Sequence, residues 1–328
     1  MFWPREYGGR GSSYVDYVIF LEEIARRGSP GYNAIGAKML APTLIEYGTE
    51  EQKGRHLEPI AQGEEFWCEG FSEPEAGSDL ASLKTRARKS NGYYLINGQK
   101  TWSTFAQYSQ WCCLLARTDP ESKRHRGLSF FLVDLSSPGI TVRPIENLLG
   151  DADFCEIFFE DVKVPKENLV GEEGQGWQVA QTFLSHERVT IAPVAVVQTM
   201  LERLCEYLRD ARLQVGVEVR HRLAQLAIEA EVGRLICYRV AWLHDRKQAT
   251  EWHAAMSRLY STQLWKRATG EVLQLLGLYG LLDEDVRGSL RGWFSRLYLA
   301  SLGATVAAGT SEIQKNIIAL RGLGLPRG

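Results

Sequence analysis

The sequence predicts an α+β fold with N-terminal helices, a central small β-barrel or sandwich domain and a C-terminal four-helix-type bundle. Apolar residues recur at helical spacing near both ends of the chain, whereas short β-rich runs separated by turn residues occupy its middle. The expected domains are therefore 1–66, 67–165 and 166–328. A chain of 328 residues that is 45% hydrophobic can bury cores of this size.

The first 66 residues carry two helix signals. One helix is expected to begin after Ser13 and to end at Gly28. The residues that form its apolar face are Val15, Val18, Ile19, Leu21 and Ile24. A second signal lies at Thr49 and Gln52, which have the T-x-x-Q form of a capping box.

The region 67–165 changes to β-type patterning. Its short β-rich runs are 92–96, 111–116, 128–133, 140–142 and 154–164. Turn chemistry is expected at Asn97–Gly98 and at residues 137–139, which read SPG. Runs of this length and spacing indicate a small barrel or sandwich.

Helical spacing returns after a glycine-rich turn at residues 171–176. Apolar residues then recur at steps of four: Val196, Met200, Leu204 and Leu208. The runs 222–243 and 254–276 are long enough to pack as antiparallel helices. The C-terminal half is therefore expected to be a helical bundle.

Composition excludes several function classes. The formal net charge is −2, with 38 basic and 40 acidic residues spread along the chain, so no basic surface for nucleic acid is expected. The sequence has no secretory apolar stretch and no run of about 18 apolar residues. Its six cysteines and six histidines lack the spacing of a metal site. We expect a cytoplasmic protein without nucleic-acid partner, membrane insertion or metal.

Three segments together resemble the acyl-CoA dehydrogenase family. Residues 71–79 read FSEPEAGSD, residues 97–104 read NGQKTWST and residues 308–314 read AGTSEIQ. They are similar to the T/S-E-P-x-A-G-S-D, N-G-x-K-x-W-x-T and G-T-S-x-I-Q patterns of that family, and they follow the same order. The resemblance covers nearly the whole chain. It also implies that the range 1–66 is an incomplete N-terminal domain, because the first helices of the family precede this point.

The resemblance implies FAD as cofactor and an acyl-CoA thioester as substrate. Oxidation of a Cα–Cβ bond needs a hydride acceptor, which no side chain provides. The residues that it places along the flavin and the neck of the substrate site are Phe71, Ser72, Gly77, Ser78, Trp102 and Thr104. Among these, Trp102 and Thr104 contact the isoalloxazine, Gly77 permits close backbone approach, and Ser78 also contacts substrate. Composition alone would make Trp102 an ordinary core residue of a strand.

The resemblance assigns the adenine end of FAD to a neighbouring subunit. The residues implied are Gly309, Thr310 and Glu312, so the enzyme would be at least a dimer. Gln274 is similar to the first residue of the family's Q-x-x-G-G-x-G segment at the FAD pyrophosphate, although Leu278 replaces one glycine. The alternative for this segment is a buried helix end with a glycine stop.

Two positions compete for the catalytic base. Many family members carry a glutamate directly before the G-T-S motif, but Ala308 occupies that position here and accepts no proton. A second branch uses a glutamate followed by an arginine on the first helix after the β domain, and Glu187–Arg188 fits that arrangement. A positioned carboxylate in apolar surroundings suits a general base. Composition alone favours a solvated helix face for this pair.

Two further roles follow from the resemblance. Adjacent helical residues point about 100° apart, so Arg188 is expected to shape the substrate pocket or a domain contact instead of pairing with Glu187. The backbone N–H of Ala308 is expected to stabilise negative charge on the thioester oxygen, since a change of side chain leaves that group in place.

Three functions remain open at this level. The first is an active dehydrogenase that assembles as a homo-oligomer (dimer or tetramer) or with a sister subunit and passes electrons to an electron-transferring flavoprotein. The second is a non-catalytic or incomplete partner subunit of a heteromeric enzyme, and the third is an oxygen-using acyl-CoA oxidase. Trp102, Thr104 and Glu187 favour catalysis, whereas Ala308 and the incomplete N-terminal domain favour the partner role. A branched or bulky acyl group is the expected substrate.

Overall fold

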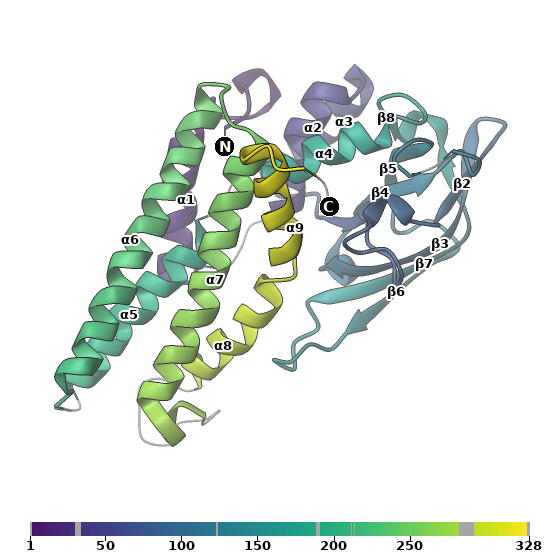
Figure 1. Cartoon of the computed structure of the whole chain (residues 1–328). Coiled ribbons are helices and arrows are strands. Elements are labelled where there is room, and N and C mark those ends of the chain that lie inside the picture. Colours follow the sequence, from purple (N-terminus) through teal and green to yellow (C-terminus); the bar gives the residue numbers. More distant parts are fainter. Residues whose placement is uncertain are drawn as a thin grey trace. The chain divides into compact units, whose positions relative to one another are not determined.

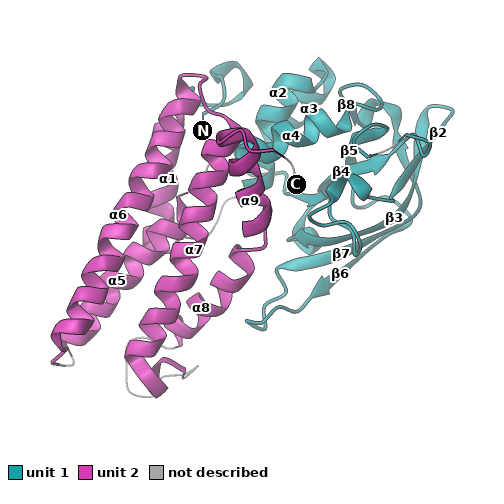
Figure 2. Cartoon of the chain, viewed as in Figure 1, with its two compact units in different colours: residues 1–12, 31–187 teal, residues 13–30, 188–328 magenta. Residues whose placement is uncertain are grey.

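The computed structural model describes residues 2–29, 34–122, 124–187, 191–210, 212, 214–281 and 292–326. The chain divides into two compact units (Figure 2), of which unit 1 comprises residues 1–12 and 31–187 and unit 2 comprises residues 13–30 and 188–328. Unit 1 contains the strands and several short helices, and unit 2 is helical. The predicted α+β class, with helical regions on either side of a β region, is confirmed.

The helices of unit 1 are η2 (Ile35–Leu40), α2 (Ala41–Tyr47), α3 (Glu50–Gln62) and α4 (Gly176–Glu187) (Figure 1). Short 3₁₀ turns occur at η1 (Arg5–Tyr7), η3 (Leu80–Ser82), η4 (Ala106–Tyr108) and η5 (Lys166–Asn168). Helix α3 begins at the predicted capping box, where Gln52 N–H donates to Thr49 Oγ1 at 3.2 Å and Thr49 N–H donates to Gln52 Oε1 at 3.1 Å. This prediction is confirmed.

The strands of unit 1 are β1 (Trp67–Gly70), β2 (Arg86–Ser90), β3 (Tyr93–Thr104), β4 (Trp111–Arg117), β5 (Leu128–Asp134), β6 (Ile140–Ile145), β7 (Phe154–Pro165) and β8 (Leu169–Val170). They form one sheet in the order β6-β7-β3-β2-β4-β5-β8, and β1 pairs in parallel with β4. Within the described residues the end strands β6 and β8 do not pair with each other. The β region is therefore an open sheet and not a closed barrel.

One predicted turn is wrong and another is confirmed. Asn97 and Gly98 lie inside β3, where a β-bulge interrupts the pairing with β7. The Asn97 side chain donates to Asp161 Oδ1 at 2.9 Å and accepts from the Asp161 N–H at 3.0 Å, so it bridges the irregular register. Bulges and hairpin turns favour the same residue types because both need unusual backbone angles. The chain does turn at residues 135–139, as predicted.

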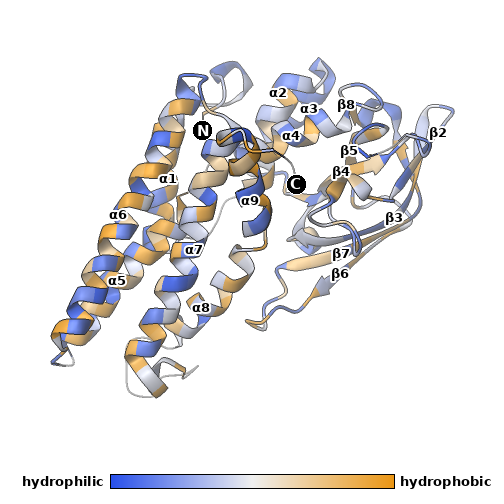
Figure 3. Cartoon of the chain, viewed as in Figure 1, coloured by the Kyte–Doolittle hydropathy of each residue, from blue (hydrophilic) through white to orange (hydrophobic). Residues whose placement is uncertain are grey.

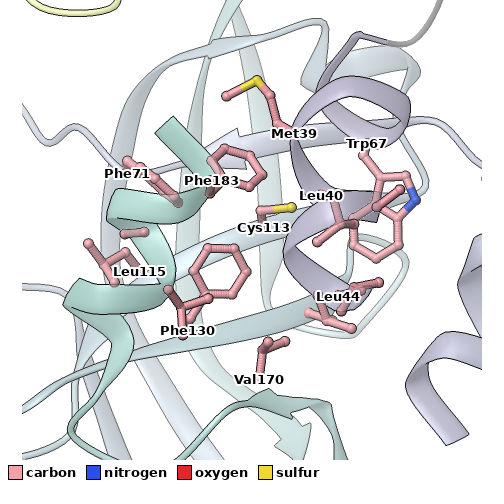
Figure 4. Packing of buried hydrophobic residues seen from close by; sticks show 14 of the residues in the cluster. Met39, Leu40, Leu44, Trp67, Phe71, Cys113, Leu115, Phe130, Val170 and Phe183 are labelled. Carbon is pink, nitrogen blue, oxygen red and sulfur yellow. The ribbon is translucent and has the colours of Figure 1, made fainter. Parts of the chain in front are cut away.

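An apolar layer between the sheet and helices η2, α2 and α4 forms the main core of unit 1 (Figure 4). The Phe71 ring centroid lies 5.8 Å from that of Phe130 and 5.3 Å from that of Phe183, and the centroids of Phe130 and Phe183 are 5.7 Å apart. Met39 and Leu40 of η2 are buried in the same layer. Burial of each large apolar side chain contributes about 1.5–3 kcal/mol. The layer therefore fixes α4 against the sheet.

The helices of unit 2 are α1 (Tyr14–Arg27), α5 (Ala192–Asp210), α6 (Val217–Asp245), α7 (Glu251–Leu276), η6 (Gly277–Leu281), α8 (Trp293–Ala304), α9 (Ser311–Ile317) and η7 (Ile318–Gly322). Residues of α5, α6, α7 and α8 share one hydrophobic core, which confirms the predicted C-terminal helical region. Hydrophobic and hydrophilic residues are interspersed along the long helices (Figure 3). Among the described residues, no helix is long and apolar enough to cross a membrane.

Helix α1 joins unit 2 although it lies near the start of the chain. It begins at a capping box on Ser13 and ends at Gly28 in the left-handed conformation, as predicted. The Glu22 carboxylate is buried and accepts from Arg234 Nε and Tyr238 Oη, both at 2.6 Å. These charge-assisted hydrogen bonds attach α1 to α6.

We expect Glu22→Gln to lower the free energy of unfolding by about 1–3 kcal/mol, because it removes the charged acceptor of two hydrogen bonds. Glu23→Gln is the matched control, since the Glu23 carboxylate is exposed and lies 3.9 Å from Arg27. Its loss is expected to change stability by no more than about 0.5 kcal/mol. Chemical denaturation measures both, and equal effects would show that the Glu22 contacts do not stabilise the unit.

Candidate functional site

Two of the motif segments meet at one buried ion pair in unit 1. The Lys100 ammonium of β3 donates to Glu73 Oε1 at 2.9 Å and to the carbonyl oxygen of Phe71 at 2.9 Å. The Thr101 N–H donates to the carbonyl oxygen of Ser72, also at 2.9 Å. The FSEPEAGSD segment is thereby held along β3.

Burial determines the titration of this pair. It lowers the pKa of Lys100 to about 8, against the raising influence of Glu73. Burial raises the pKa of Glu73, but Lys100 and the N–H groups of Thr85 and Lys84 outweigh it, so this pKa is lowered. An unfolded lysine titrates at about 10.4. Between about pH 8 and pH 10 the unfolded state therefore binds more protons, and the Lys100 contribution to stability rises with pH.

Trp102 projects from a second bulge of β3. Its φ of 62° lies in the left-handed region, and the pairing of β3 with β7 shifts register between Lys100 and Ser103. The side chain is 57% exposed, and its ring meets Phe154 edge-on with centroids 6.1 Å apart. A bulge re-aims a side chain, and here it turns a large aromatic ring outward. The interpretation of Trp102 as a core strand residue is wrong.

The other predicted flavin residues of unit 1 have different surroundings. Phe71 is buried, and its ring packs against Phe183. Gly77 and Ser78 are exposed, and a Cβ built at Gly77 would meet no described atom within 4 Å. Thr104 is partly buried at the end of β3. The FSEPEAGSD segment therefore has exposed backbone at Gly77 and Ser78 and a buried side chain at Phe71.

Glu187 is the last residue of α4 and is partly buried, so it does not lie on a fully solvated face. Its carbonyl oxygen accepts from Lys38 Nζ at 2.7 Å, and Lys38 reaches it from η2. The C-terminal end of a helix carries partial negative charge and unsatisfied carbonyls. The Lys38 ammonium satisfies one of these carbonyls and offsets the charge. Arg188 lies outside the described residues.

A second carboxyl group, which the sequence interpretation missed, belongs to the same unit. Glu69 lies on β1, and its Oε2 is buried without a hydrogen-bond partner in the described part of the chain. Burial, and then the charge of Glu187, raise the pKa of Glu69 to about 8. One signal was available, because Glu69 is an acidic residue within the apolar run WCEGF at 67–71.

The C-terminal motif forms a tight turn before α9 in unit 2. Ala308 and Gly309 have φ values of 54° and 91°, and the Gln314 amide donates to their two carbonyl oxygens at 3.1 and 3.0 Å. The φ of Gly309 lies in the region that favours glycine, and a Cβ there would lie 2.7 Å from that amide nitrogen, so the Gln314 side chain would have to shift. The Thr310 hydroxyl accepts a backbone N–H of α9 at 3.2 Å, and Glu312 is exposed.

The segment that begins at Gln274 is a helix end. Gln274 is exposed in the last turn of α7, and its carbonyl oxygen accepts from the N–H of Gly277, whose φ is 56°. Leu278, at the position where the family pattern has glycine, is 81% exposed in η6. The structure thus brings Trp102 and Glu187 into unit 1 and keeps Gln274 in unit 2 with the C-terminal motif.

Known proteins resemble this chain over its full length. Family models for the N-terminal, middle and C-terminal domains of acyl-CoA dehydrogenases match residues 1–64, 68–162 and 174–323. Acyl-CoA dehydrogenase IpdE1 of Mycolicibacterium smegmatis is 40% identical, and the match covers 99% of this chain and 84% of the relative.

Two solved structures show the same fold. The Tcur3481-Tcur3483 steroid ACAD has a TM-score of 0.95 at 30% identity, over 100% of this chain and 85% of that one. The ChsE4-ChsE5 complex from Mycobacterium tuberculosis has a TM-score of 0.91 at 35% identity, over 100% and 86%.

We expect Lys100→Met to lower the free energy of unfolding by about 3–5 kcal/mol, because it leaves the buried Glu73 charge without its partner. Lys84→Met is the matched control: its ammonium pairs with Glu75 at 2.5 Å, but both side chains are exposed. An exposed pair contributes about 0–1 kcal/mol. Urea denaturation at pH 7 measures both variants, and a small loss for Lys100→Met would show that the pair does not anchor the motif.

Proposed function

This chain belongs to the acyl-CoA dehydrogenase family, and from that premise we propose that it oxidises the Cα–Cβ bond of a branched or bulky acyl-CoA to the 2-enoyl-CoA, with Glu187 as base. FAD-dependent dehydrogenation of acyl-CoA thioesters is the general activity of this family. The observation that carries the proposal is Glu187 itself, a partly buried carboxylate anchored at the end of α4 beside the core. The position before the G-T-S motif has no carboxylate to compete with it.

The residues of unit 1 fit a flavin. Trp102 offers an exposed aromatic face for stacking, and the open backbone at Gly77 and Ser78 can approach a ligand closely. Thr104 adds a hydroxyl group at the end of β3. The start of the FSEPEAGSD segment is bound to β3 through the carbonyl oxygens of Phe71 and Ser72. The unit 2 residues that we propose to hold FAD are Gln274, Gly309, Thr310 and Glu312. When bound, FAD supplies the hydride acceptor that the side chains lack.

Glu187 is the proton acceptor in this proposal. The α C–H bond breaks, and the proton forms an O–H bond on the Glu187 carboxylate. Phe183, one helical turn earlier, is fully buried against Phe71, so the end of α4 is held on the sheet. Lys38 fixes the backbone of Glu187 directly. A base held in this way loses little orientational freedom when it reacts.

Ala308 is the proposed donor to the thioester oxygen, through its backbone N–H. The conformation of this turn is set by the hydrogen bonds from Gln314 to Ala308 and Gly309, and not by the Ala308 side chain. A fixed N–H aimed at an oxygen that gains negative charge lowers the barrier. Ser78 and Arg188 are the proposed substrate contacts.

We propose a homo-oligomer (dimer or tetramer) or a pair with a sister subunit, an electron-transferring flavoprotein as electron acceptor, and a cytoplasmic location. One solved relative is the ChsE4-ChsE5 complex, and another is the Tcur3481-Tcur3483 steroid ACAD. These relatives support the heteromeric option and the bulky acyl group.

A second candidate function is that of a non-catalytic or incomplete partner subunit. Ala308 is the observation that favours it, because the position that holds the base in many members carries no acid here. In that case Glu187 would have no role in turnover.

We expect Glu187→Gln to keep bound flavin and to lower turnover by about 10²- to 10⁴-fold, because it removes the proton acceptor and preserves the side-chain shape. Glu167→Gln is the control, since this exposed carboxylate follows β7 and takes no part in the site. Flavin absorbance measures cofactor content, and reduction of an artificial electron acceptor measures turnover. Full activity in Glu187→Gln would exclude Glu187 as the base.

A further inference from the structure

Glu69 faces the apolar layer of unit 1. Side chains alternate between the two faces of a strand, so Glu69 shares a face with Trp67 before it and with Phe71 just after β1. Both of these neighbours belong to the core layer between the sheet, η2 and α4. Across the strand pair, Glu69 lies opposite Cys113 of β4, which is buried in the same layer. A partly buried acidic side chain thus lies against an apolar core.

Glu187 approaches this position from α4. The Phe183 ring packs against Phe71 with centroids 5.3 Å apart, and Glu187 lies four residues after Phe183, on the same helix face. Glu69 lies two residues before Phe71 on the same strand face. Both β1 and α4 also pack against η2 and β4. The two carboxyl groups therefore lie near each other, in agreement with the effect of the Glu187 charge on Glu69.

No cation compensates Glu69 among the described residues. Other titratable groups on β1 or on the elements packed against it are Cys68 of β1, Cys112, Cys113 and Arg117 of β4, Tyr93, Tyr94 and Lys100 of β3, Tyr108 of η4 and Lys38 of η2. The Arg117 guanidinium is bound to the backbone carbonyl oxygens of Ala81 and Leu83. The Lys100 ammonium is bound to Glu73, and the Lys38 ammonium is bound to the Glu187 carbonyl oxygen. Glu69 Oε2 is buried and accepts no hydrogen bond from the described part of the chain.

We propose that Glu69 is a positioning residue for the base: Glu69 and Glu187 share one proton at neutral pH, and Glu69 holds it. Two neighbouring carboxyl groups in an apolar site cannot both ionise at low cost. Glu69, whose Oε2 is buried without a hydrogen-bond partner in the described part of the chain, keeps the proton. Its role in turnover rests on the proposed function of Glu187, whereas the shared proton does not.

The pair has a consequence for the pH dependence of the reaction. Above about pH 8 Glu69 loses its proton, because this is the pKa that burial and Glu187 give it. The site then holds two negative charges before any charge develops on the thioester oxygen. That second charge favours transfer of the α proton to Glu187, because the transfer removes one of the two neighbouring charges, and turnover rises.

The direct experiment is an infrared titration from pH 6 to pH 10, which follows the C=O stretch of protonated carboxyl groups. In the wild type, one band is expected to persist at pH 7 and to disappear near pH 8. Glu69→Gln is expected to lack it. The control Glu64→Gln removes an exposed carboxylate two residues after the end of α3. This variant is expected to keep the infrared band. A band that survives in Glu69→Gln overturns the proposal.

The same titration of Glu187→Gln tests the coupling and does not depend on the folding of the Glu69 variant. Removal of the Glu187 charge is expected to move the Glu69 midpoint to lower pH, because a like charge no longer opposes its ionisation. An unchanged midpoint would show that the two groups do not interact, which also overturns the proposal.

Turnover separates this proposal from the function of Glu187. The ratio of the turnover at pH 9 to that at pH 7 is expected to be severalfold lower in Glu69→Gln than in the wild type and in Glu64→Gln. An equal ratio in all three would overturn the positioning role. If Glu187→Gln shifts the infrared midpoint but keeps full turnover, the shared proton stands and Glu187 is not the base.

Discussion

The buried ion pair between Lys100 and Glu73 is the constraint on which the described site of unit 1 depends. It joins side chains 27 residues apart in the sequence, one on a loop and one on β3. A buried charge is costly unless it is paired and hydrogen-bonded, so neither segment can move away without exposing the other to that cost. Glu73 has two further backbone donors and Lys100 has a carbonyl acceptor, which makes the connection specific as well as strong.

Two structural consequences lead from this pair to the site. First, the ion pair fixes β3 at Lys100, two residues before Trp102. The bulge with the positive φ at Trp102 therefore holds the indole in one outward orientation. Second, Phe71 is fixed by its backbone, and its ring forms the core contact that holds Phe183 and the end of α4. The proposed stacking surface and the proposed base are therefore attached to the same anchor, although they lie on different elements.

Local signals in the sequence were sufficient for several elements. The helix start at Ser13 and the capping box at Thr49 were predictable because a cap involves residues only three positions apart. Asn97–Gly98 was read as a hairpin turn, since bulges use the same residue types and the strand partner, Asp161, is distant in the sequence. The resemblance predicted a ligand contact for Trp102, but the bulge that turns it outward was not predicted, because a positive φ at a tryptophan contradicts its ordinary preference.

Tertiary arrangement was less accessible than local structure. Nothing local indicates that α1 joins the C-terminal helices, because its attachment through Glu22 and Arg234 spans 212 residues. Glu69 was missed for the same reason: its significance comes from η2, which packs against β1, and from Glu187 of α4, and both belong to other parts of the chain. Motif resemblance identified the residues of the family pattern, and it said nothing about a carboxyl group outside that pattern.

The central claim is that this chain is an acyl-CoA dehydrogenase that reacts at its own flavin. The most direct test is the visible absorbance of the protein reconstituted with FAD, followed under anaerobic conditions as acyl-CoA esters with bulky and short acyl chains are added. We expect the oxidised flavin band to bleach with a branched or bulky ester and to bleach more slowly with butyryl-CoA. A chain that binds no FAD, or a flavin that no ester reduces, would contradict the claim and favour a non-catalytic partner subunit.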